Sequence, residues 1–540
     1  MSSKKLVPFA LALSFSTGAL ALETPISEVP VANPKAAGMV APNMLSRELG
    51  QMPVAVGAMK LENPTGNITH YGYLGNGPLI PILGDVQSTT HNVEASKTEP
   101  DKNVYLILPD QVGPDTGYYY GSHFLFQGHE AGAGYLTRIN LDADPTHRVT
   151  LMASTDVAGK ALPTFDGITW NPFTQRLLLT AELGANGGVW QATADFPSKV
   201  EDISGVLGRG GYEGIQLDGD GNIWIVEDVG GKNGTVNKSA RQPNSFLYRF
   251  VPNDAHNTAA GGKLQALQVM SRAHAGPIVF HASDPDGDIL SQDMKDLHTY
   301  GLVFDTNWVT IHDTARDGNT PFDANALAKT AGATPFKRPE NGVFRPDTKF
   351  SEFYFTETGD TNANTEAGSE YGGFGGVFKL MQTNPSANVG QLRIHLRGDK
   401  AHTGFDNIAF WSDNRYIVVE DAGDNLHGQR NALDSAYMAD IRVNYAVVAP
   451  LRILAQGRDP SATMDSMLLA NSGTGFQNDG DNEITGIHIS DGDPSEKGLL
   501  GGKDPKVFQG GRVFYTQQHG DNITWEITPS LLYSFSPWLP

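Results

Sequence analysis

Acidic residues stand at both ends of a short strand–turn–strand segment, residues 211–228, GYEGIQLDGDGNIWIVED. Glu213 precedes a run in which apolar and polar residues alternate, and Glu227 ends a run rich in β-branched and aromatic residues, as strands prefer. The intervening DGDGN favours a tight turn, because glycine accepts positive φ and aspartate bonds to its own backbone. An antiparallel hairpin would therefore bring Glu213 and Glu227 to the same edge of a sheet.

The same arrangement recurs along the chain. Three further segments carry an acid at each end: Asp166 and Glu182, Glu340 and Glu357, and Asp406 and Glu420. Weaker copies are the segment from Tyr300 to Asp313, the segment that starts at Glu483, and a run that ends at His129 and Glu130. These roughly seven hairpins predict an all-β fold, a β-propeller of six or seven blades with short helical insertions. Two such insertions are expected at residues 322–333, with Asp323 as the helix cap, and at 426–442.

The repeated acids predict a metal site. Inner strands line the channel of a propeller, so acids in one register would gather at one mouth. A single acid at a strand end is usually solvated, but crowded carboxylates repel one another unless a cation compensates them. Oxygen-rich sites suit Ca²⁺ or Mn²⁺. The predicted ligands are Asp166, Glu182, Glu213, Glu227, Glu340, Glu357, Asp406, Glu420 and Glu483.

Histidine and arginine residues lie in the same register as the acids. His312, like His129 and His519, stands at a strand end and could bind a metal or donate a proton to a leaving group. Arg338 lies near a strand start, where it could pair with an anionic substrate or neutralise the acids. The chain has no cysteine, no G-x-S-x-G and no H-E-x-x-H, so hydrolysis would require a metal-bound hydroxide or oxide. The candidate catalytic residues are Glu213, Glu340, His312 and Arg338.

Composition narrows the class of protein. The 540 residues carry a net charge of -21, which makes nucleic acid a poor partner. Residues 1–21 resemble an export signal, with Lys4 and Lys5 before an apolar run that is too short to span a membrane. We expect a periplasmic or secreted monomer without a membrane segment. Residues 22–60 would form an extended arm, and 61–540 a single propeller domain.

Four segments resemble, in the same order, parts of the PhoX-type alkaline phosphatases. They are GRGGYEGIQLDGDGNIWIVEDVGG…NSFLYRFVP (208–252), NALAKTAGATPFKRPENGVF (325–344), GFDNIAFWSDNRYIVVED (404–421) and EITGIHISDGD…GRVFYTQQHGDN (483–522). The resemblance implies an exported propeller that hydrolyses phosphate esters with metals at its axial mouth. It also implies that Glu213, Glu340 and Asp406 are metal ligands.

One departure from the family concerns the metal. The family generally has a cysteine ligand in a C-A-G-G stretch, whereas the corresponding place here reads TFDGITW, with Asp166 as the nearest substitute. An all-oxygen site favours Ca²⁺, with Mn²⁺ or Fe³⁺ as the second metal. The predicted function is a metal-dependent phosphoric-ester hydrolase acting on small phosphate esters. The alternatives are a phosphotriesterase or a Ca²⁺-dependent lactonase or esterase on the same propeller, and a non-catalytic, calcium-stabilised binding protein.

Overall fold

The computed structural model describes residues 26–35, 42–75, 98–457, 483–518 and 522–530. The predicted signal segment and His519 lie outside these ranges. Among the described helices, none combines the length and the apolar character that crossing a membrane requires.

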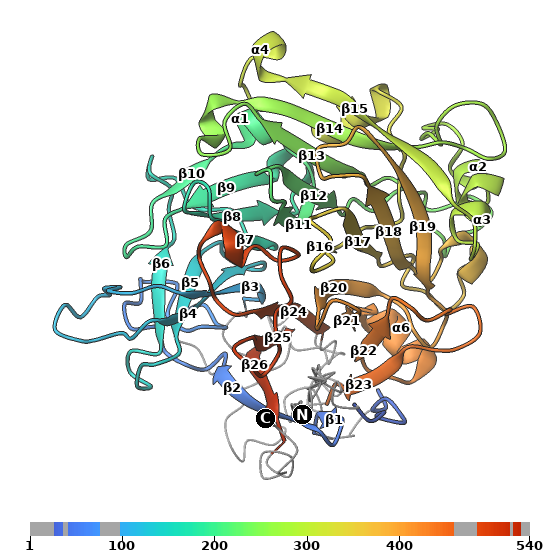
Figure 1. The fold of residues 1–540 in the computed structure, drawn as a ribbon. Coiled ribbons are helices and arrows are strands. Elements are labelled where there is room, and N and C mark those ends of the chain that lie inside the picture. The colour runs from blue at the N-terminus through green and yellow to red at the C-terminus, as the bar shows by residue number, and fades with distance from the viewer. Residues whose placement is uncertain (1–25, 36–41, 76–97, 458–482, 519–521, 531–540) are drawn as a thin grey trace, which may run out of the picture.

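Hydrogen-bonded sheets of antiparallel strands form six blades around a common centre (Figure 1), which confirms the predicted all-β propeller. From the inner to the outer strand, the first blade contains β3 (Pro100–Ile107), β4 (His123–His129), β5 (Leu136–Asn140) and β6 (Val149–Ala153), and the second contains β7 (Ile168–Asn171), β8 (Arg176–Ala181), β9 (Gly188–Ala192) and β10 (Val200–Asp202). The third contains β11 (Tyr212–Leu217), β12 (Ile223–Glu227), β13 (Leu247–Pro252) and β14 (Gly262–Val269), and the fourth β16 (Gly342–Phe344), β17 (Glu352–Glu357), β18 (Gly376–Gln382) and β19 (Val389–Arg397). The fifth contains β20 (Phe405–Phe410), β21 (Arg415–Glu420), β22 (Ser435–Asp440) and β23 (Leu451–Ala455), and the sixth β24 (Glu483–Ser490), β25 (Arg512–Gln518), β26 (Ile523–Pro529) and β2 (Leu49–Ala55).

Three strands join parts of the ring that are distant in sequence. β15 (Phe304–Asp313) pairs with β14 and with β19, so the third and fourth blades share one nine-stranded sheet. β2 pairs with β26 and completes the sixth blade, and β1 (Met44–Leu45) pairs with β23. The predicted extended arm therefore contributes two strands, because a sheet edge offers unpaired backbone groups that an added strand satisfies.

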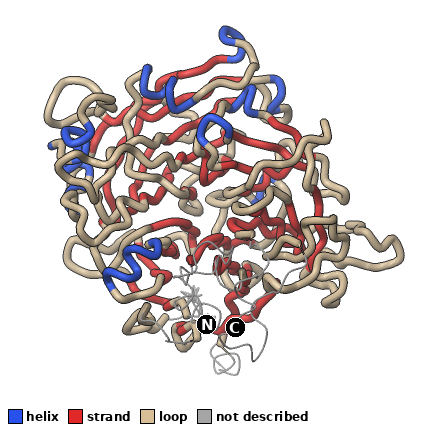
Figure 2. Tube along the Cα trace, turned by 180° about the vertical axis from the view of Figure 1, so that it is seen from behind, coloured by secondary structure: helices blue, strands red, loops and turns tan. Residues whose placement is uncertain are grey.

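Helices are short and lie between strands, mostly toward the outside of the ring (Figure 2). They are α1 (Ser204–Leu207), α2 (Pro285–Ile289), α3 (Gln292–Leu297), α4 (Thr314–Asp317), α5 (Ala324–Thr330) and α6 (Gly423–Arg430). The predicted helix at 322–333 is confirmed as α5, and the Asp323 side chain caps it by accepting a hydrogen bond from Ala326 N at 2.8 Å. The second expected helix is confirmed only up to Arg430, since residues 435–440 form β22.

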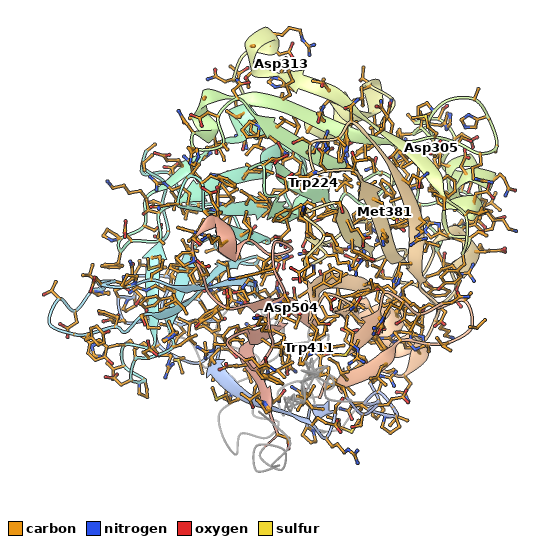
Figure 3. The ribbon with its side chains drawn as sticks, in the orientation of Figure 1. Trp224, Asp305, Asp313, Met381, Trp411 and Asp504 are labelled. Carbon is orange, nitrogen blue, oxygen red and sulfur yellow. The ribbon has the colours of Figure 1, made fainter. Side chains whose placement is uncertain are left out.

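Apolar and aromatic side chains fill the spaces between blades. Trp224, labelled in Figure 3, extends from β12 toward the fourth blade, and its ring centroid lies 4.9 Å from that of Phe353 and 5.1 Å from that of Phe344. Aromatic pairs at such distances stabilise packing beyond the area that they bury. This layer fixes the angle between neighbouring blades and so the positions of their inner strands.

The loop between β24 and β25 covers one end of the channel. Gly492 O accepts a hydrogen bond from Ile107 N at 2.7 Å, and Pro494 O accepts one from Trp170 Nε1 at 2.7 Å. Ile107 and Trp170 lie toward the ends of β3 and β7, whereas the acids of interest lie at the strand starts. The acids therefore lie at the end of the channel opposite to this loop.

Candidate metal centre

Five of the six inner strands present an acid at the same position. These acids are Asp101, Asp166, Glu213, Glu340 and Asp406, and all five side chains are buried. The equivalent residue in β24 is Gly486, which lies within a bulge and has φ +63°. Pairing shifts across this position in β3, β11, β20 and β24, and such bulges turn a side chain away from the regular face of a sheet. In β3, β11 and β20 the bulge therefore turns the acid toward the centre, whereas Asp166 and Glu340 lie just before β7 and β16.

The carboxylates form one continuous cluster at the mouth. Ligand atoms lie within 4.8 Å of one another in each of three groups: Asp101, Glu130 and Asp166; Asp166, Glu182 and Glu213; and Glu213, Glu340 and Asp406. The groups share Asp166 and Glu213, so seven acids are linked. Glu130 and Glu182 come from the ends of the second strands of their blades. Carboxylate oxygens at this density are the donor set that Ca²⁺ and Mn²⁺ prefer.

Burial and mutual repulsion oppose ionisation of the cluster. Burial raises the pKa of Asp166 well above its ordinary value, and the charges of Glu213 and Asp101 raise it further. The pKa values of Glu213, Glu340 and Asp406 are raised in the same direction, first by burial and then by neighbouring carboxylates. Divalent cations would remove this penalty, because they compensate the negative charge that burial disfavours. The residues present therefore fit a metal cluster.

Threonines of the second strands hold the backbone of the acids. Thr356 Oγ1 donates to Asp406 O at 2.5 Å, and Thr516 Oγ1 donates to Asp101 O at 3.2 Å. Thr180 Oγ1 likewise donates to Glu213 O. In each case the threonine belongs to the preceding blade, so the contact fixes one acid relative to its neighbour around the ring.

Arg338 lies beside the cluster and is partly exposed. Its Nη2 donates to Asp228 Oδ2 at 2.7 Å and lies 3.5 Å from Glu340 Oε1. The residue has φ +58°, a left-handed conformation that a non-glycine residue adopts at a cost. This conformation directs the guanidinium to the mouth while Glu340, two residues on, faces the cluster.

Three predicted ligands, Glu227, Glu357 and Glu420, are directed elsewhere. Cross-strand partners point to the same side of a sheet, and Glu227 is opposite Tyr212 rather than Glu213. Glu420 is opposite Phe405 rather than Asp406 in the same way. The side chains therefore enter the space between blades, one residue out of register with the channel. This placement corrects the expectation that they complete the metal shell.

Each of the three glutamates is held by hydrogen bonds within the blades. The contacts are Glu227 Oε2 with Tyr248 Oη at 2.8 Å and Asn325 Nδ2 at 3.0 Å, Glu357 Oε1 with Lys337 N at 2.8 Å, Glu357 Oε2 with His298 Nε2 at 2.9 Å, and Glu420 Oε2 with Arg430 Nη2 at 3.0 Å. The residue after each glutamate faces the mouth instead. Asp228, after Glu227, pairs with Arg338, and the hydroxyl of Thr358, after Glu357, donates to Glu340. The charge of Asp421, after Glu420, raises the pKa of Asp406. The three glutamates thus stabilise the blades.

His312 and Glu483 also lie apart from the three acid groups. His312 is on β15, next to Asp313, which Figure 3 labels at the rim, and its ring stacks on Phe322 with centroids 3.7 Å apart. A position on an outer strand cannot serve the channel, which corrects the proposed proton-donor role. Glu483 is half-buried and pairs in the β24–β25 ladder with Gln518. The sixth blade contributes Gly486 at the acid position instead.

Two acids of the cluster, Asp101 and Glu130, were not predicted as ligands. Asp101 is the second residue of β3, the inner strand of the first blade. The sequence signal for it was the run PDKNVYLI, which precedes the strand HFLFQGH and Glu130. Glu130 ends that hairpin, but the neighbouring His129 is buried inside the blade, with Nδ1 2.9 Å from Thr98 Oγ1 and Nε2 3.0 Å from Thr137 Oγ1. Recognising the first hairpin would have supplied both acids.

Replacing Glu227 with glutamine tests whether its side chain faces the channel or the space between blades. We expect unchanged metal content and a melting temperature lowered by no more than about 2 °C, because glutamine can still accept the three hydrogen bonds made to Oε2. Elemental analysis and thermal denaturation of the variant would check this. A loss of bound metal would mean that Glu227 belongs to the cluster.

Comparisons with known proteins agree with the resemblance found in the sequence. Residues 231–441 match the family model described as alkaline phosphatase PhoX. Among solved structures, Pseudomonas fluorescens PhoX in complex with vanadate, a transition state analogue, aligns with a TM-score of 0.53 and 11% identity over 94% of this chain and 98% of that chain. A gluconolactonase from Xanthomonas campestris aligns with a TM-score of 0.38 and 10% identity over 93% and 99% of the two chains. No curated protein matches the sequence. The predicted resemblance to PhoX is thereby confirmed, and the propeller fold is similar to that of the Pseudomonas fluorescens protein.

Proposed function

We propose that this chain is a metal-dependent phosphoric-ester hydrolase of the PhoX type. The observation that carries the proposal is the cluster of seven acids, five of them buried, at one mouth of a propeller. The PhoX match supports it, since residues 231–441 include Arg338, Glu340 and Asp406. Asp101, Asp166 and Glu213 lie outside the matched residues, and their place in the site is supported by the geometry of the acid groups.

The seven acids would hold the ions, with Asp166 and Glu213 each shared between two groups. Ca²⁺ with Mn²⁺ or Fe³⁺ is the proposed set, because the donors are oxygens and the chain has no thiolate. The bound ions would supply Lewis acidity and activate water toward phosphorus.

The protein's own groups position the reaction. The threonine contacts fix the backbone carbonyls of Asp101, Glu213 and Asp406, so the carboxylates are held in place before a substrate arrives. Arg338 carries a fixed positive charge at the edge of the cluster, where its planar guanidinium suits the oxygens of an anionic phosphate. Asp228 orients that guanidinium by accepting from Nε at 2.9 Å and from Nη2 at 2.7 Å.

This arrangement predicts a preference for phosphate monoesters. We expect kcat/KM for p-nitrophenyl phosphate to exceed that for a neutral phosphotriester or a lactone by at least about tenfold, because Arg338 adds attraction only for an anion. Steady-state rates of the metal-saturated protein on the three substrates would decide. A higher rate on the triester or the lactone would favour those activities, and no turnover combined with metal-dependent stability would favour a binding protein.

Export also belongs to this proposal. A basic start, an apolar run and the small residues Ala19 and Ala21 support removal of residues 1–21 and a periplasmic or secreted location. Small phosphate esters, rather than nucleic acid, are the proposed substrates, since the net charge is -21. A monomer formed by one propeller remains the proposed assembly.

A further inference from the structure

A cavity of about 390 Å³ lies in the fifth blade, beside the outer strands. It is formed by α6, β22, β23 and the loop between β19 and β20, and Figure 1 shows the two strands and the helix next to one another. Its lining includes Lys400, Glu420, Arg430, Ser435, Tyr437 and Arg452. None of these residues belongs to an inner strand or to the three acid groups. The cavity therefore shares no side chain with the candidate metal centre.

One of the three cations in this lining is already neutralised within the blade. Arg430 Nη1 and Nη2 lie 3.1 Å and 3.0 Å from the two carboxylate oxygens of Glu420, and Nη2 lies 3.3 Å from Asp434 Oδ1. Glu420 also accepts hydrogen bonds from Thr403 N at 3.0 Å and from Ser435 N at 2.9 Å. Because two carboxylates compensate it, Arg430 has no excess charge to offer a ligand.

Arg452, in contrast, is a half-buried cation whose partners are all neutral. Its Nε donates to Ser435 Oγ at 3.0 Å, its Nη1 to Val29 O at 3.4 Å and its Nη2 to Tyr437 Oη at 3.3 Å. The guanidinium carbon lies 5.4 Å from the centroid of the Tyr437 ring. No carboxylate in the described part of the chain forms an ion pair with this guanidinium. Removing a cation from water is costly, and an anion in the cavity would compensate that cost.

Lys400 brings a second positive charge to the same cavity. It is exposed and forms no ion pair among the residues that the structure describes, and the neighbouring Asp399 pairs with a histidine at 3.0 Å. The Tyr437 hydroxyl joins the two sides of the cavity, because it accepts from Arg452 Nη2 and donates to Ala401 O at 3.2 Å. Two cations without a counter-charge thus face one cavity in a chain whose net charge is -21.

We propose that this cavity is an accessory binding site for a phosphate dianion, either as the free ion or as the phosphate group of a small organic molecule. A phosphate monoester carries a charge of about −1.5 to −2 at pH 7, which matches the two uncompensated cations. The planar guanidinium of Arg452 suits two phosphate oxygens, and the Lys400 ammonium suits a third. The volume lies within the range of roughly 300–1,000 Å³ that is usual for small-ligand pockets, so an organic group has room beside the phosphate. The site uses none of the metal-binding acids and does not depend on phosphatase activity.

Titration calorimetry with two probes tests the site and identifies the source of the phosphate group. Inorganic phosphate represents the free ion, and phenylphosphonate represents an organic phosphate with a C–P bond that a phosphatase does not hydrolyse. The protein is saturated with metal and dialysed, so that free metal does not precipitate the phosphate. At pH 8 we expect binding at a site besides the metal centre. A lower Kd for phenylphosphonate would identify a phosphate ester as the ligand, and a lower Kd for phosphate would identify the free ion.

Substitutions of the two cations test their role. Arg452→Gln should raise the Kd of the accessory site at least about tenfold, because it removes a charged hydrogen-bond donor from a half-buried position. Lys400→Gln should raise it about threefold, and because this side chain is exposed the substitution does not disturb the fold. Lys160→Gln, which removes an exposed lysine outside the cavity, is the matched control and should change nothing. All three variants should keep the wild-type kcat on p-nitrophenyl phosphate.

Glu213→Gln separates the accessory site from the metal centre. This variant weakens the acid cluster and should leave the Kd of the accessory site unchanged. Loss of all phosphate binding in Glu213→Gln, or unchanged binding in Lys400→Gln, would overturn the proposal whether or not Arg452→Gln folds. A wild type without phosphatase activity whose phosphate binding still depends on Lys400 would refute the proposed function and retain this site.

Discussion

Replacing Glu213 with glutamine is expected to lower kcat on p-nitrophenyl phosphate by a factor of about 10² to 10³, the loss seen when one group that stabilises a transition state is removed. Glu213 belongs to two of the three acid groups, so the substitution weakens metal binding on both sides of it. Glutamine keeps the size of the side chain and leaves the contact between Thr180 and the Glu213 carbonyl in place. The effect should therefore come from the lost charge. Steady-state kinetics and elemental analysis would measure it.

Glu227→Gln is the matched control, because both residues are buried glutamates on one hairpin. The control should retain metal and activity within about twofold, since Glu227 faces Tyr248 between the blades. The chelated Glu213→Gln protein should also be at least as stable as the chelated wild type, because one repelling carboxylate is gone. Equal losses of activity in the two variants would show that fold damage, and not the metal site, explains the result.

The hairpins could be predicted because their signals are local. Alternation of apolar residues, an Asp-Gly turn and an acid at the strand start all occur within about twenty residues, as in 211–228. Aligning such hairpins placed Asp166, Glu213, Glu340 and Asp406 in one register, and the structure brings the four together with Asp101. The local pattern was sufficient to predict the register of the inner-strand acids, because the same bulge recurs in several blades.

Of the predicted second-strand acids, Glu182 lies in the cluster, but Glu227, Glu357 and Glu420 do not, and the pattern alone could not separate them. Glu227 and Asp228 are adjacent, and a difference of one residue decides whether a side chain faces the channel or the space between blades. The bulges shift the pairing between Tyr212 and Ile215, so counting from the turn selects the wrong acid. Pairing β2 with β26, and β15 with β19, depends on contacts between segments distant in sequence, for which the chain gives no local signal.

Removal of metal should make the stability of the protein strongly dependent on pH. Burial and repulsion raise the pKa values of Asp166, Glu213, Glu340 and Asp406 above those of the unfolded chain. Groups with a raised pKa in the folded state contribute stability that is complete below the unfolded value of about 4 and is lost as pH rises through the folded value. The chelated protein should therefore become less stable as the pH rises above 4.

Bound metal should reverse this trend, because protons and cations compete for the same carboxylates. Each pKa unit corresponds to about 1.4 kcal/mol, and for a chain of this length about 1 kcal/mol changes the melting temperature by roughly 1 °C. We therefore expect the gap between metal-saturated and EDTA-treated protein to widen by at least about 5 °C from pH 5 to pH 8. Burial raises the pKa of Glu227 to about 7, and its titration affects the metal-saturated and the EDTA-treated protein alike. The difference between their melting temperatures therefore reports on the acid cluster alone. Thermal denaturation at four pH values, with Glu213→Gln showing a smaller change, would test this. Parallel curves would mean that the seven acids do not hold metal.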